Sequence, residues 1–328
     1  MKGIDNHFAL AIDVGGSKVA YALIDIQGKM LGPIDKLAVP FDNNGVASAE
    51  RLIAQMHRFV EGANLYPGTF DGIGMGLCGN VDLKTGMVVL APNLHWRQVP
   101  FAALVAKAYR LPVFASMDVR LAALGEAVWG GAKGVRNFAW VTIGTGYGGY
   151  FFLDGKLYDG RHAFAGNFGH IPLDEVAGYP CGCGLRGCIE TYVSGPGIAR
   201  AAQEVINANR SPTLMHLAGD GKVTCEMVFQ AQAVGDPAAI EIIEKVIRIV
   251  AKSVAGLVNT LDLEMIILGG GVTNGSPDFV IRLDRHIRAL LMTEEARREL
   301  VIIKESFPNS TLYGAAANVF ISQGLLKL

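Results

Sequence analysis

The sequence lacks a concentration of basic residues. Its 29 Lys and Arg residues nearly balance its 30 Asp and Glu residues, and no basic run stands out. The long-range attraction that a nucleic-acid backbone requires is therefore missing. We expect no nucleic-acid partner.

Long uninterrupted apolar segments are also lacking. The start of the chain has no charged segment followed by an apolar one, and the apolar stretch from Asn137 to Leu153 is broken by glycine and polar residues. These absences argue against a secretory signal and a membrane anchor. We expect a cytoplasmic protein that is not attached to a membrane.

Length and apolar content predict two lobes. The chain has 328 residues, more than one hydrophobic core usually supports, and 51% of them are hydrophobic. Apolar strand-like runs alternate with segments of helical spacing, as in an α/β lobe. The predicted strands are 8–14, 19–24, 72–77, 113–115 and 265–268, and the predicted helices are 47–63, 101–109, 119–129 and 237–261.

A weak internal repeat relates two parts of the sequence. Residues 137–158 contain an apolar run, the turn Gly144-Thr145-Gly146 and a second apolar run, which echoes the opening segment and its glycine turn. Two such units suggest a duplicated architecture whose turns face each other across a cleft. Two unrelated hairpins are the simpler alternative.

The segment Asp13-Val14-Gly15-Gly16-Ser17-Lys18 has the character of a phosphate site. It places an acidic side chain at the end of a predicted strand, before two residues with no side chain to obstruct a phosphate. Backbone N–H groups of such turns bind phosphate oxygens, and a neighbouring carboxylate can hold Mg²⁺. A tight hairpin that simply needs glycine explains the segment equally well.

Two other nucleotide motifs are excluded. Residues 144–149 contain G-x-G-x-x-G, but a dinucleotide-binding motif opens a helix, and here the strand-like run 150–153 follows. No G-x-x-x-x-G-K-[ST] occurs in the chain. A phosphate-binding turn between two strands remains consistent with Gly144, Thr145 and Gly146.

Three of the five cysteines lie close together and follow a histidine. His170, Cys181, Cys183 and Cys188 supply one imidazole and three thiolates, enough for a tetrahedral Zn²⁺ site. A fully ligated site leaves no position for water, so we assign it to structure and set aside a zinc-dependent hydrolase. Four unconnected residues are the alternative. Cys78 and Cys225 are interpreted as core residues.

Asp118 and a triple glycine complete the candidates. Asp118 lies between a predicted strand and a predicted helix, where it is either a helix N-cap or a general base that takes a proton from a substrate hydroxyl. Gly269, Gly270 and Gly271 end a buried strand and allow close approach of an adenosine. A flexible turn explains the glycines alone.

Together these features resemble the ROK family of sugar kinases and repressors. The resemblance covers nearly the whole chain and rests on 13–18, 144–146, Gly169-His170, the cysteine block through Glu190, and 269–271. It implies an α/β fold of the actin-like ATPase (ribonuclease H-like) type, duplicated and two-lobed with a central cleft. It further implies lobes at 1–119 and 120–311, a helix at 312–328 that completes the first lobe, and a homodimer or homotetramer.

The resemblance also implies an activity and residue roles. ATP with Mg²⁺ would phosphorylate a hexose or hexosamine, at the 6-hydroxyl, with Asp118 as base and positioning plus charge stabilisation as the source of rate. His170 would bind zinc through one nitrogen and sugar through the other. ATP and its phosphates would contact Asp13, Gly15, Gly16, Ser17, Lys18, Gly144, Thr145, Gly146, Gly269, Gly270 and Gly271; the sugar would contact Gly79, Asn80, Asn93, Met117, Asp118, Asn167, His170 and Glu190.

Two departures from the family pattern concern the sugar. Family kinases have Glu where this chain has Asn167, and Asn where it has Met117 and Arg120. An amide binds a hydroxyl more weakly than a carboxylate does, by about 1 kcal/mol, and a thioether makes no strong hydrogen bond. We therefore hypothesise an altered sugar, including a carbon-rich or acyl-bearing one facing Met117.

The same departures keep a second function open. The chain could be a sugar-binding regulator that retains the scaffold. Repressors of the family carry a helix-turn-helix ahead of the phosphate motif, and only twelve residues precede Asp13. Asp118 and every phosphate-facing glycine motif are present, which favours an active kinase.

Overall fold

The computed structural model describes residues 7–63 and 69–328. They form two compact units. Unit 1 comprises the described residues of Met1–Val135 together with Phe151–Ala165 and Glu305–Leu328, and unit 2 comprises Arg136–Tyr150 and Gly166–Lys304. The chain thus passes between the units four times. This division differs from the expected one at residue 120, because the helix after Asp118 packs on the last helix of the chain within unit 1.

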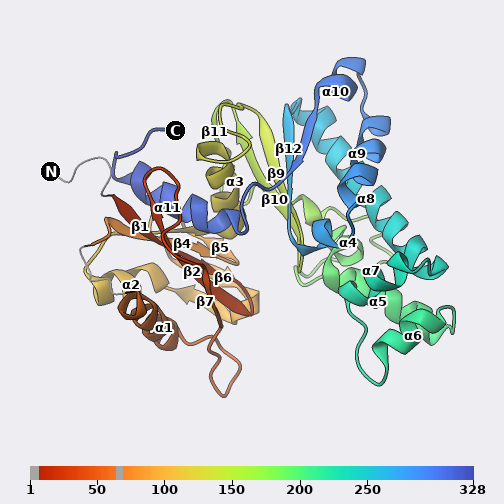
Figure 1. The fold of residues 1–328 in the computed structure, drawn as a ribbon, viewed down its shortest axis with the longest axis horizontal. Coiled ribbons are helices and arrows are strands. Elements are labelled where there is room, and N and C mark those ends of the chain that lie inside the picture. Colours follow the sequence, from red (N-terminus) through yellow and green to blue (C-terminus); the bar gives the residue numbers. More distant parts are fainter. Residues whose placement is uncertain (1–6, 64–68) are drawn as a thin grey trace. The chain divides into compact units, whose positions relative to one another are not determined.

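Unit 1 is built on a five-stranded sheet with the order β3-β2-β1-β4-β8 (Figure 1). The central strand β1 pairs antiparallel with β2 and parallel with β4, and β4 pairs parallel with β8. Its strands are β1 (Phe8–Val14), β2 (Lys18–Asp25), β3 (Asp35–Ala38), β4 (Gly72–Leu77) and β8 (Val113–Met117). Four of these five strands were predicted, because their apolar runs are buried; β3 is mostly exposed and was missed.

Helices cover both faces of this sheet. Figure 1 shows the sheet between the pair α1 (Ala49–Gly62) and α2 (Phe101–Tyr109) and the pair α3 (Asp118–Val128) and α11 (Ser310–Ser322). The Ser48 hydroxyl caps α1 by accepting from the backbone N–H of Arg51 at 3.3 Å. Every predicted helix of this part of the chain is confirmed.

Glycine allows α11 to sit deep in unit 1. A Cβ on Gly314 would overlap the carbonyl of Leu121 in α3, and a Cβ on Gly74 would overlap the carbonyl of Ala315. The backbones of α3, α11 and β4 therefore approach each other more closely than any side chain would permit. This close packing fixes the start of α3, where Asp118 lies, relative to the sheet.

A small antiparallel sheet adds a further part of unit 1 that the sequence did not indicate. It has the order β5-β6-β7 and comprises β5 (Asn80–Val81), β6 (Val88–Ala91) and β7 (Trp96–Val99). The 3-10 helix η2 (Pro92–Leu94) joins β6 to β7 and carries Asn93. These strands are too short to produce a clear alternation of apolar and polar residues.

The second sheet repeats the order of the first. Its order β11-β10-β9-β12-β13 matches β3-β2-β1-β4-β8 strand for strand in chain order, and β9 and β12 are parallel as β1 and β4 are. The strands are β9 (Phe138–Ile143), β10 (Tyr147–Leu153), β11 (Lys156–Leu157), β12 (Met265–Gly269) and β13 (Val301–Lys304), and residues from Phe151 to Ala165 are grouped with unit 1. The predicted internal repeat is confirmed.

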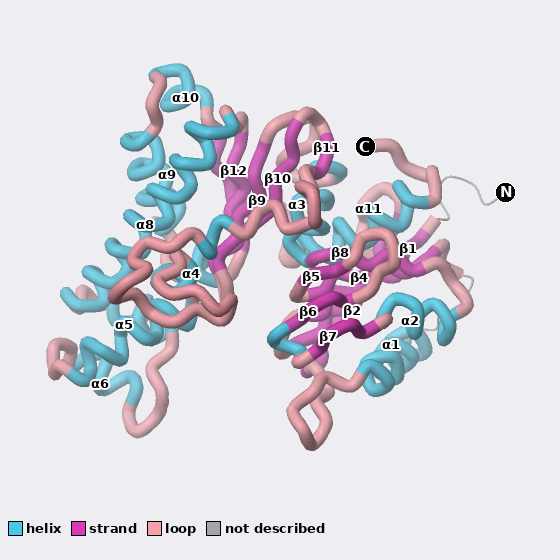
Figure 2. The backbone as a smooth tube through the Cα atoms, turned by 180° about the vertical axis from the view of Figure 1, so that it is seen from behind, coloured by secondary structure: helices cyan, strands magenta, loops and turns pink. Residues whose placement is uncertain are grey.

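Apart from its strands, unit 2 consists of helices and loops, including the long loop 171–189 (Figure 2). The long helix α8 begins at Pro237, where Asp236 accepts from the N–H of Ala239 at 2.9 Å. The helices are α4 (Glu190–Val193), α5 (Gly195–Asn207), α6 (Pro212–Ala218), α7 (Cys225–Ala233), α8 (Pro237–Leu261), α9 (Phe279–Leu290) and α10 (Glu294–Glu299), with 3-10 helices η3 (Phe168–His170) and η4 (Gly271–Asn274). Within the described residues, none of the helices combines the length and apolar character that a membrane crossing needs.

Candidate active site and metal centre

The turn after β1 in unit 1 brings together the predicted positions Asp13, Gly16 and Asn93. Asp13 lies one residue before the end of β1, and the turn that follows is closed by the N–H of Gly15, which donates to the Lys18 carbonyl at 2.9 Å. Gly16 lies against Asn93: a Cβ at Gly16 would be 2.7 Å from the Cβ of Asn93. The turn therefore requires glycine because of a close approach as well as a tight bend, while Ser17 and Lys18 are exposed.

Asp13 is a half-buried carboxylate with an amide partner. Its Oδ2 accepts from the Nδ2 of Asn309 at 2.8 Å. Burial raises the pKa of Asp13 above its usual range, although the hydrogen bond from Asn309 and the charge of Lys36 act in the opposite direction. Asn309, 296 residues further along the chain, was not predicted to belong to the site.

Asp118 is the first residue of α3. Met117 occupies the N-cap position and makes no side-chain capping bond, whereas the Oδ1 of Asp118 accepts from the adjacent N–H of Val119 at 2.8 Å. Burial, and then the negative charge of Asp13, raise the pKa of Asp118 to about 7. Unit 1 thus holds two carboxylates that are poorly solvated and interact with each other.

The neighbouring predicted positions line the same strand ends. Cys78 follows β4, and burial together with the charges of Asp118 and Asp13 raises its pKa to about 12. Gly79 lies against the carbonyl of Leu90, and Asn80 opens β5. Cys78 is half-buried and lies beside the two aspartates, which corrects its interpretation as a plain core residue.

Met117, directly before Asp118, and Arg120, two residues after it, differ in their surroundings. Met117 is only 6% exposed, so its side chain is covered by protein. Arg120 makes a two-pronged ion pair with Asp159, with Nε–Oδ1 at 2.7 Å and Nη2–Oδ2 at 3.3 Å. The burial of Met117 favours a packing role over the contact with an acyl-bearing substrate that the sequence suggested.

A large cavity in unit 2 lies at its glycine turns. The cavity has a volume of about 770 Å³. The turn Gly144–Gly146 is closed by the N–H of Gly144, which donates to the Gly146 carbonyl at 2.9 Å. The lining residues are Gly144, Thr145, Gly195, Pro196, Ala199, Val223, Thr224, Cys225, Glu226, Phe229, Gln230, Ala233, Gly271, Val272, Asn274 and Gly275. The structure therefore brings the two predicted glycine motifs of this unit to one cavity.

The triple glycine has a specific backbone role in this cavity. Gly270 has φ +91°, and a Cβ there would overlap the carbonyl of Ile143. The cavity wall formed by α7 was not predicted, and Cys225 in that wall is half-buried, which corrects its interpretation as a core residue. Residues 224–233 carry an ordinary helical pattern, which contains no signal for a ligand.

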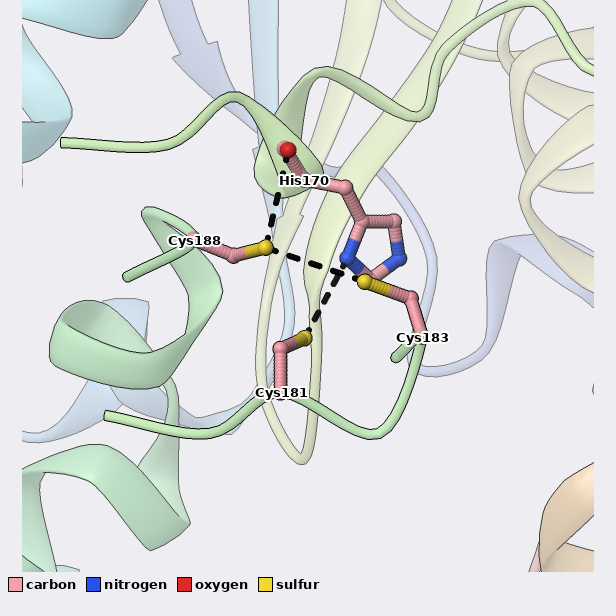
Figure 3. Close-up of side chains that lie close together, drawn as sticks. All are labelled: His170, Cys181, Cys183 and Cys188. Atoms are coloured by element: carbon pink, nitrogen blue, oxygen red, sulfur yellow. Dashed lines mark hydrogen bonds between the residues drawn. The ribbon is translucent and has the colours of Figure 1, made fainter. Parts of the chain in front are cut away.

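The four predicted metal ligands converge in unit 2 (Figure 3). Their ligand atoms all lie within 4.8 Å of one another. The Sγ atoms of Cys183 and Cys188 are 3.7 Å apart, and the Sγ of Cys181 is 3.5 Å from the Nδ1 of His170. A tetrahedral zinc with Zn–S bonds of ~2.3 Å and a Zn–N bond of ~2.0 Å would set these edges at ~3.8 and ~3.5 Å. The spacing fits a four-ligand zinc site.

Local backbone geometry explains the convergence. The N–H of Cys181 donates to the Leu185 carbonyl at 2.8 Å, which closes a turn around Cys183, and Gly187 has φ +70°. The N–H of Ile189 donates to the Ile171 carbonyl at 3.0 Å, which sets Cys188 beside His170. Figure 3 shows the histidine with Nδ1 toward the thiols and its other ring nitrogen pointing away from them.

Glu190 connects the ligand cluster to the glycine turn. Its Oε2 accepts from the N–H of Tyr147 at 3.0 Å, directly after Gly146, and its Oε1 is 3.9 Å from the Sγ of Cys181. The carboxylate of Glu190 therefore lies between the ligand cluster and the turn at Gly146. Asn167, three residues before His170, is exposed, and its carbonyl accepts from the N–H of His170 at 3.0 Å.

Known proteins share this fold. A ROK family glucokinase from Streptomyces griseus, solved with glucose and AMPPNP, is 31% identical with a TM-score of 0.79 over 94% of this chain and 98% of its own. A ROK family transcriptional regulator, a homologue of the E. coli MLC protein, is 27% identical with a TM-score of 0.83 over 98% of this chain and 80% of its own. A glucokinase of Halalkalibacterium halodurans is 29% identical over 89% of each chain.

Duplicated sheets, paired glycine turns and these neighbours define an actin-like ATPase fold. Within that class, residues 9–320 match the ROK family. The chain belongs to the ROK family.

Proposed function

We propose that the chain is a sugar kinase that transfers the γ-phosphoryl group of ATP to a hydroxyl of a hexose or hexosamine, with Asp118 as general base. The observation that carries the proposal is the place of Asp118, a carboxylate at the first residue of α3, directly after the strand β8, where burial and the charge of Asp13 raise its pKa to about 7. A base whose pKa lies near the working pH is largely ionised and still has a high affinity for the proton that it takes from the hydroxyl. The 6-hydroxyl is the first candidate acceptor.

The reaction requires little covalent chemistry from the protein. The sugar oxygen forms a bond to the γ-phosphorus as the bond from that phosphorus to the bridging oxygen breaks; the hydroxyl proton passes to Asp118, and ADP leaves. Positioning and charge stabilisation supply the rate in phosphoryl transfer. Backbone N–H groups of the turns at Gly15–Gly16 and Gly144–Gly146 are suited to bind phosphate oxygens.

The cavity of unit 2 supports the nucleotide part of the proposal. Its volume of about 770 Å³ and its position at Gly144, Thr145 and Gly271 suit a nucleotide whose phosphates reach the glycine turns. Gly269 ends β12 before them, and Gly270 has the positive φ that brings its backbone against the Ile143 carbonyl. ATP use is further supported by the AMPPNP bound to the Streptomyces griseus glucokinase.

Asp13 is the residue that would hold Mg²⁺. Burial raises its pKa, and it adds to the negative charge around Asp118, so a divalent cation beside it would relieve an unfavourable charge. When bound with ATP, Mg²⁺ neutralises charge that develops on the phosphates. Asn309 keeps the carboxylate oriented.

We further propose that His170, Cys181, Cys183 and Cys188 hold a structural Zn²⁺. The full set of four ligands leaves the metal no place for a reacting water. Zinc at the Nδ1 of His170 would direct the other ring nitrogen to a sugar hydroxyl, and Glu190 would accept from another. Gly79, Asn80, Asn93 and Asn167 are the remaining proposed sugar contacts, in a chain that we expect to be a cytoplasmic homodimer or homotetramer.

A non-catalytic sugar-binding regulator is the second candidate. The similarity to the ROK transcriptional regulator and the amide at Asn167 favour it. The two functions make opposite predictions for turnover, while both predict binding of a sugar. Turnover is therefore the decisive measurement.

The experiment is release of ADP from ATP and Mg²⁺ over a panel of hexoses and N-acylhexosamines, with Asp118→Asn as the blank. We expect turnover on one sugar that is lost in the blank. Calorimetry with the same panel reports sugar binding separately. Binding without turnover, in protein that contains zinc, would replace the kinase proposal with the regulator.

The pH profile tests the role of Asp118. Because the base must be ionised, kcat/KM should fall about tenfold per pH unit below pH 7, following the raised pKa of Asp118 of about 7. The initial rate is measured from pH 5 to pH 9 at a sugar concentration well below KM. A rate that stays constant from pH 5 to pH 7 would remove Asp118 from this role.

A further inference from the structure

A buried carboxylate that the proposed mechanism does not use lies near the other end of α3. Glu126 has no exposed surface. Its Oε1 accepts from the N–H of Ser306 at 2.7 Å and from the hydroxyl of Ser310 at 2.9 Å. Its Oε2 accepts from the hydroxyl of Ser306 at 2.7 Å and from the N–H of Gly131 at 3.1 Å.

Four donors thus face the two oxygens of the carboxylate. The Ser310 hydroxyl also lies 2.9 Å from the Oε2 of Glu305, and the N–H of Gly131 also donates to the Ser306 hydroxyl at 2.8 Å, so these two donors are shared. Three of the four donors belong to Ser306 and Ser310, on the segment where the chain has just passed from unit 2 into unit 1. Such a buried network tolerates little change, because removing one partner leaves the other buried polar group without a hydrogen bond. Glu126 therefore fixes the segment 306–310 against α3.

The same segment orients Asp13. Asn309, directly before Ser310, is the N-cap of α11: its Oδ1 accepts from the N–H of Leu312 at 3.2 Å, and its Nδ2 donates to Asp13 at 2.8 Å. Both ends of the amide are thus engaged. A shift of Ser310 or Ser306 would move this amide away from the Asp13 carboxylate.

We propose that Glu126 is a positioning residue that acts through Ser306, Ser310 and Asn309 to orient Asp13 for the metal-bound nucleotide. Because Glu126 and Asp118 lie on one helix, the same helix places the base and orients the residue that would hold the cation. The proposal rests on the kinase function and assigns a role that the family resemblance did not supply.

The test is Glu126→Gln, which keeps size and replaces one acceptor oxygen by a donor. We expect kcat to fall about tenfold and the Mg²⁺ concentration for half-maximal rate to rise by a similar factor, as for a broken network of charged hydrogen bonds. The KM for sugar and the zinc content should not change. Asn309→Ala should have the same effect, and the double variant should be no worse than the more severe single variant.

Two readouts do not depend on activity. The amide hydrogen of Leu312 should exchange faster in Glu126→Gln, and Mn²⁺ binding in the presence of ADP should weaken about tenfold, in step with the same network. These readouts stand even if no sugar is turned over, so a failure of the kinase proposal can be told apart from a failure of this one. If Glu126→Gln does not fold, Ser306→Ala and Ser310→Ala remove single donors and replace it.

Asp236→Asn is the matched control. Asp236 is also buried, accepts from the Ser211 hydroxyl at 2.7 Å and caps α8 in unit 2. Asp236→Asn should lower the free energy of unfolding about as much as Glu126→Gln does and leave the Mg²⁺ requirement unchanged. A normal Mg²⁺ requirement in Glu126→Gln, or effects of Glu126→Gln and Asn309→Ala that simply add, would overturn the proposal.

Discussion

Asp118 makes the folded state less favourable at neutral pH. Its pKa is raised to about 7, while an unfolded aspartate ionises near 4, so stability is lost as pH rises from about 4 to 7. Asp118→Asn carries no charge and should raise the free energy of unfolding at pH 8 by ~4 kcal/mol, with little effect at pH 4. Urea unfolding at the two pH values measures the difference.

Asp82 supplies the control for that prediction. It is an exposed aspartate whose pKa is lowered by backbone hydrogen bonds from Thr85 and Lys84. Asp82→Asn should therefore not raise the free energy of unfolding at pH 8. A gain for both variants, or for neither, would show that the raised pKa of Asp118 does not govern stability.

Asn167 is the residue through which sugar preference can be tested. It is exposed three residues before His170, so a carboxylate there can reach a ligand without disturbing the core. Asn167→Glu should raise kcat/KM for glucose about fivefold relative to an N-acylhexosamine, since a charged acceptor strengthens a hydrogen bond by about 1 kcal/mol. Competition assays with the two sugars give the ratio directly.

Met117→Asn serves as the comparison variant. Because Met117 is buried, an amide there should lower stability and leave the preference between the sugars unchanged. An unchanged ratio in Asn167→Glu, or a changed ratio in Met117→Asn, would contradict this division of roles.

Sequence reasoning identified the residues whose chemistry is visible in their type and spacing. Asp13, Asp118 and the cysteine block belong to this group. Asn309 and Glu126 do not, because an Asn before a helix is an ordinary N-cap signal and a Glu within an apolar helix is an ordinary surface signal. Only the tertiary fold shows that Asn309 donates to Asp13 and that Glu126 is surrounded by hydrogen-bond donors.

The contact between α3 and α11 depends on a residue without a side chain. A methyl group on Gly314 would overlap the Leu121 carbonyl, so Gly314→Ala must push the two helices apart. We expect a loss of at least ~3 kcal/mol in the free energy of unfolding, since overpacking a buried contact is costly and the backbone cannot yield. Thermal or urea unfolding measures the loss.

Gly256 offers the opposite case on α8. A Cβ there meets no atom within 4 Å, and the residue is exposed. Gly256→Ala should stabilise the protein by up to ~1 kcal/mol, because alanine favours helix more than glycine does. Equal effects of the two substitutions would mean that helix propensity, and not the close contact, decides the outcome at Gly314.

At the scale of elements, burial decided what could be predicted. Strands such as β1 and β12 were predicted because their apolar runs are buried on both faces. The edge strands β3 and β13 are largely exposed, and β5 to β7 are short, so their sequences carry no comparable pattern. The cavity wall α7 lies outside every helix that was predicted.

At the scale of the molecule, the ligand cluster belongs to unit 2 alone. Chelation of zinc should therefore lower protection from hydrogen exchange in α4 and α5 by about tenfold or more, and leave α11 of unit 1 unchanged. Cys183→Ser should reproduce the effect, and Cys225→Ser, outside the cluster, should not. Uniform loss of protection in both units would contradict a structural role confined to unit 2.

The internal repeat was the most informative signal at this scale. The segment 8–25 forms β1 and β2, and the similar segment 138–157 forms β9, β10 and β11, in two sheets with matching strand order. The unit boundaries were not predictable, because α3 is grouped with α11 through contacts between segments almost 200 residues apart. Sequence distance gives no measure of such pairings.

The place of α11 in unit 1 has a consequence for synthesis on the ribosome. Strand β1 emerges first, but its partner helix and Asn309 emerge only after all of unit 2 has been translated. Unit 2 can fold while the sheet of unit 1 still lacks α11 on one face. A nascent chain would therefore form the cavity at Gly144 and bring His170 and its three cysteines together before Asn309 can orient the carboxylate of Asp13.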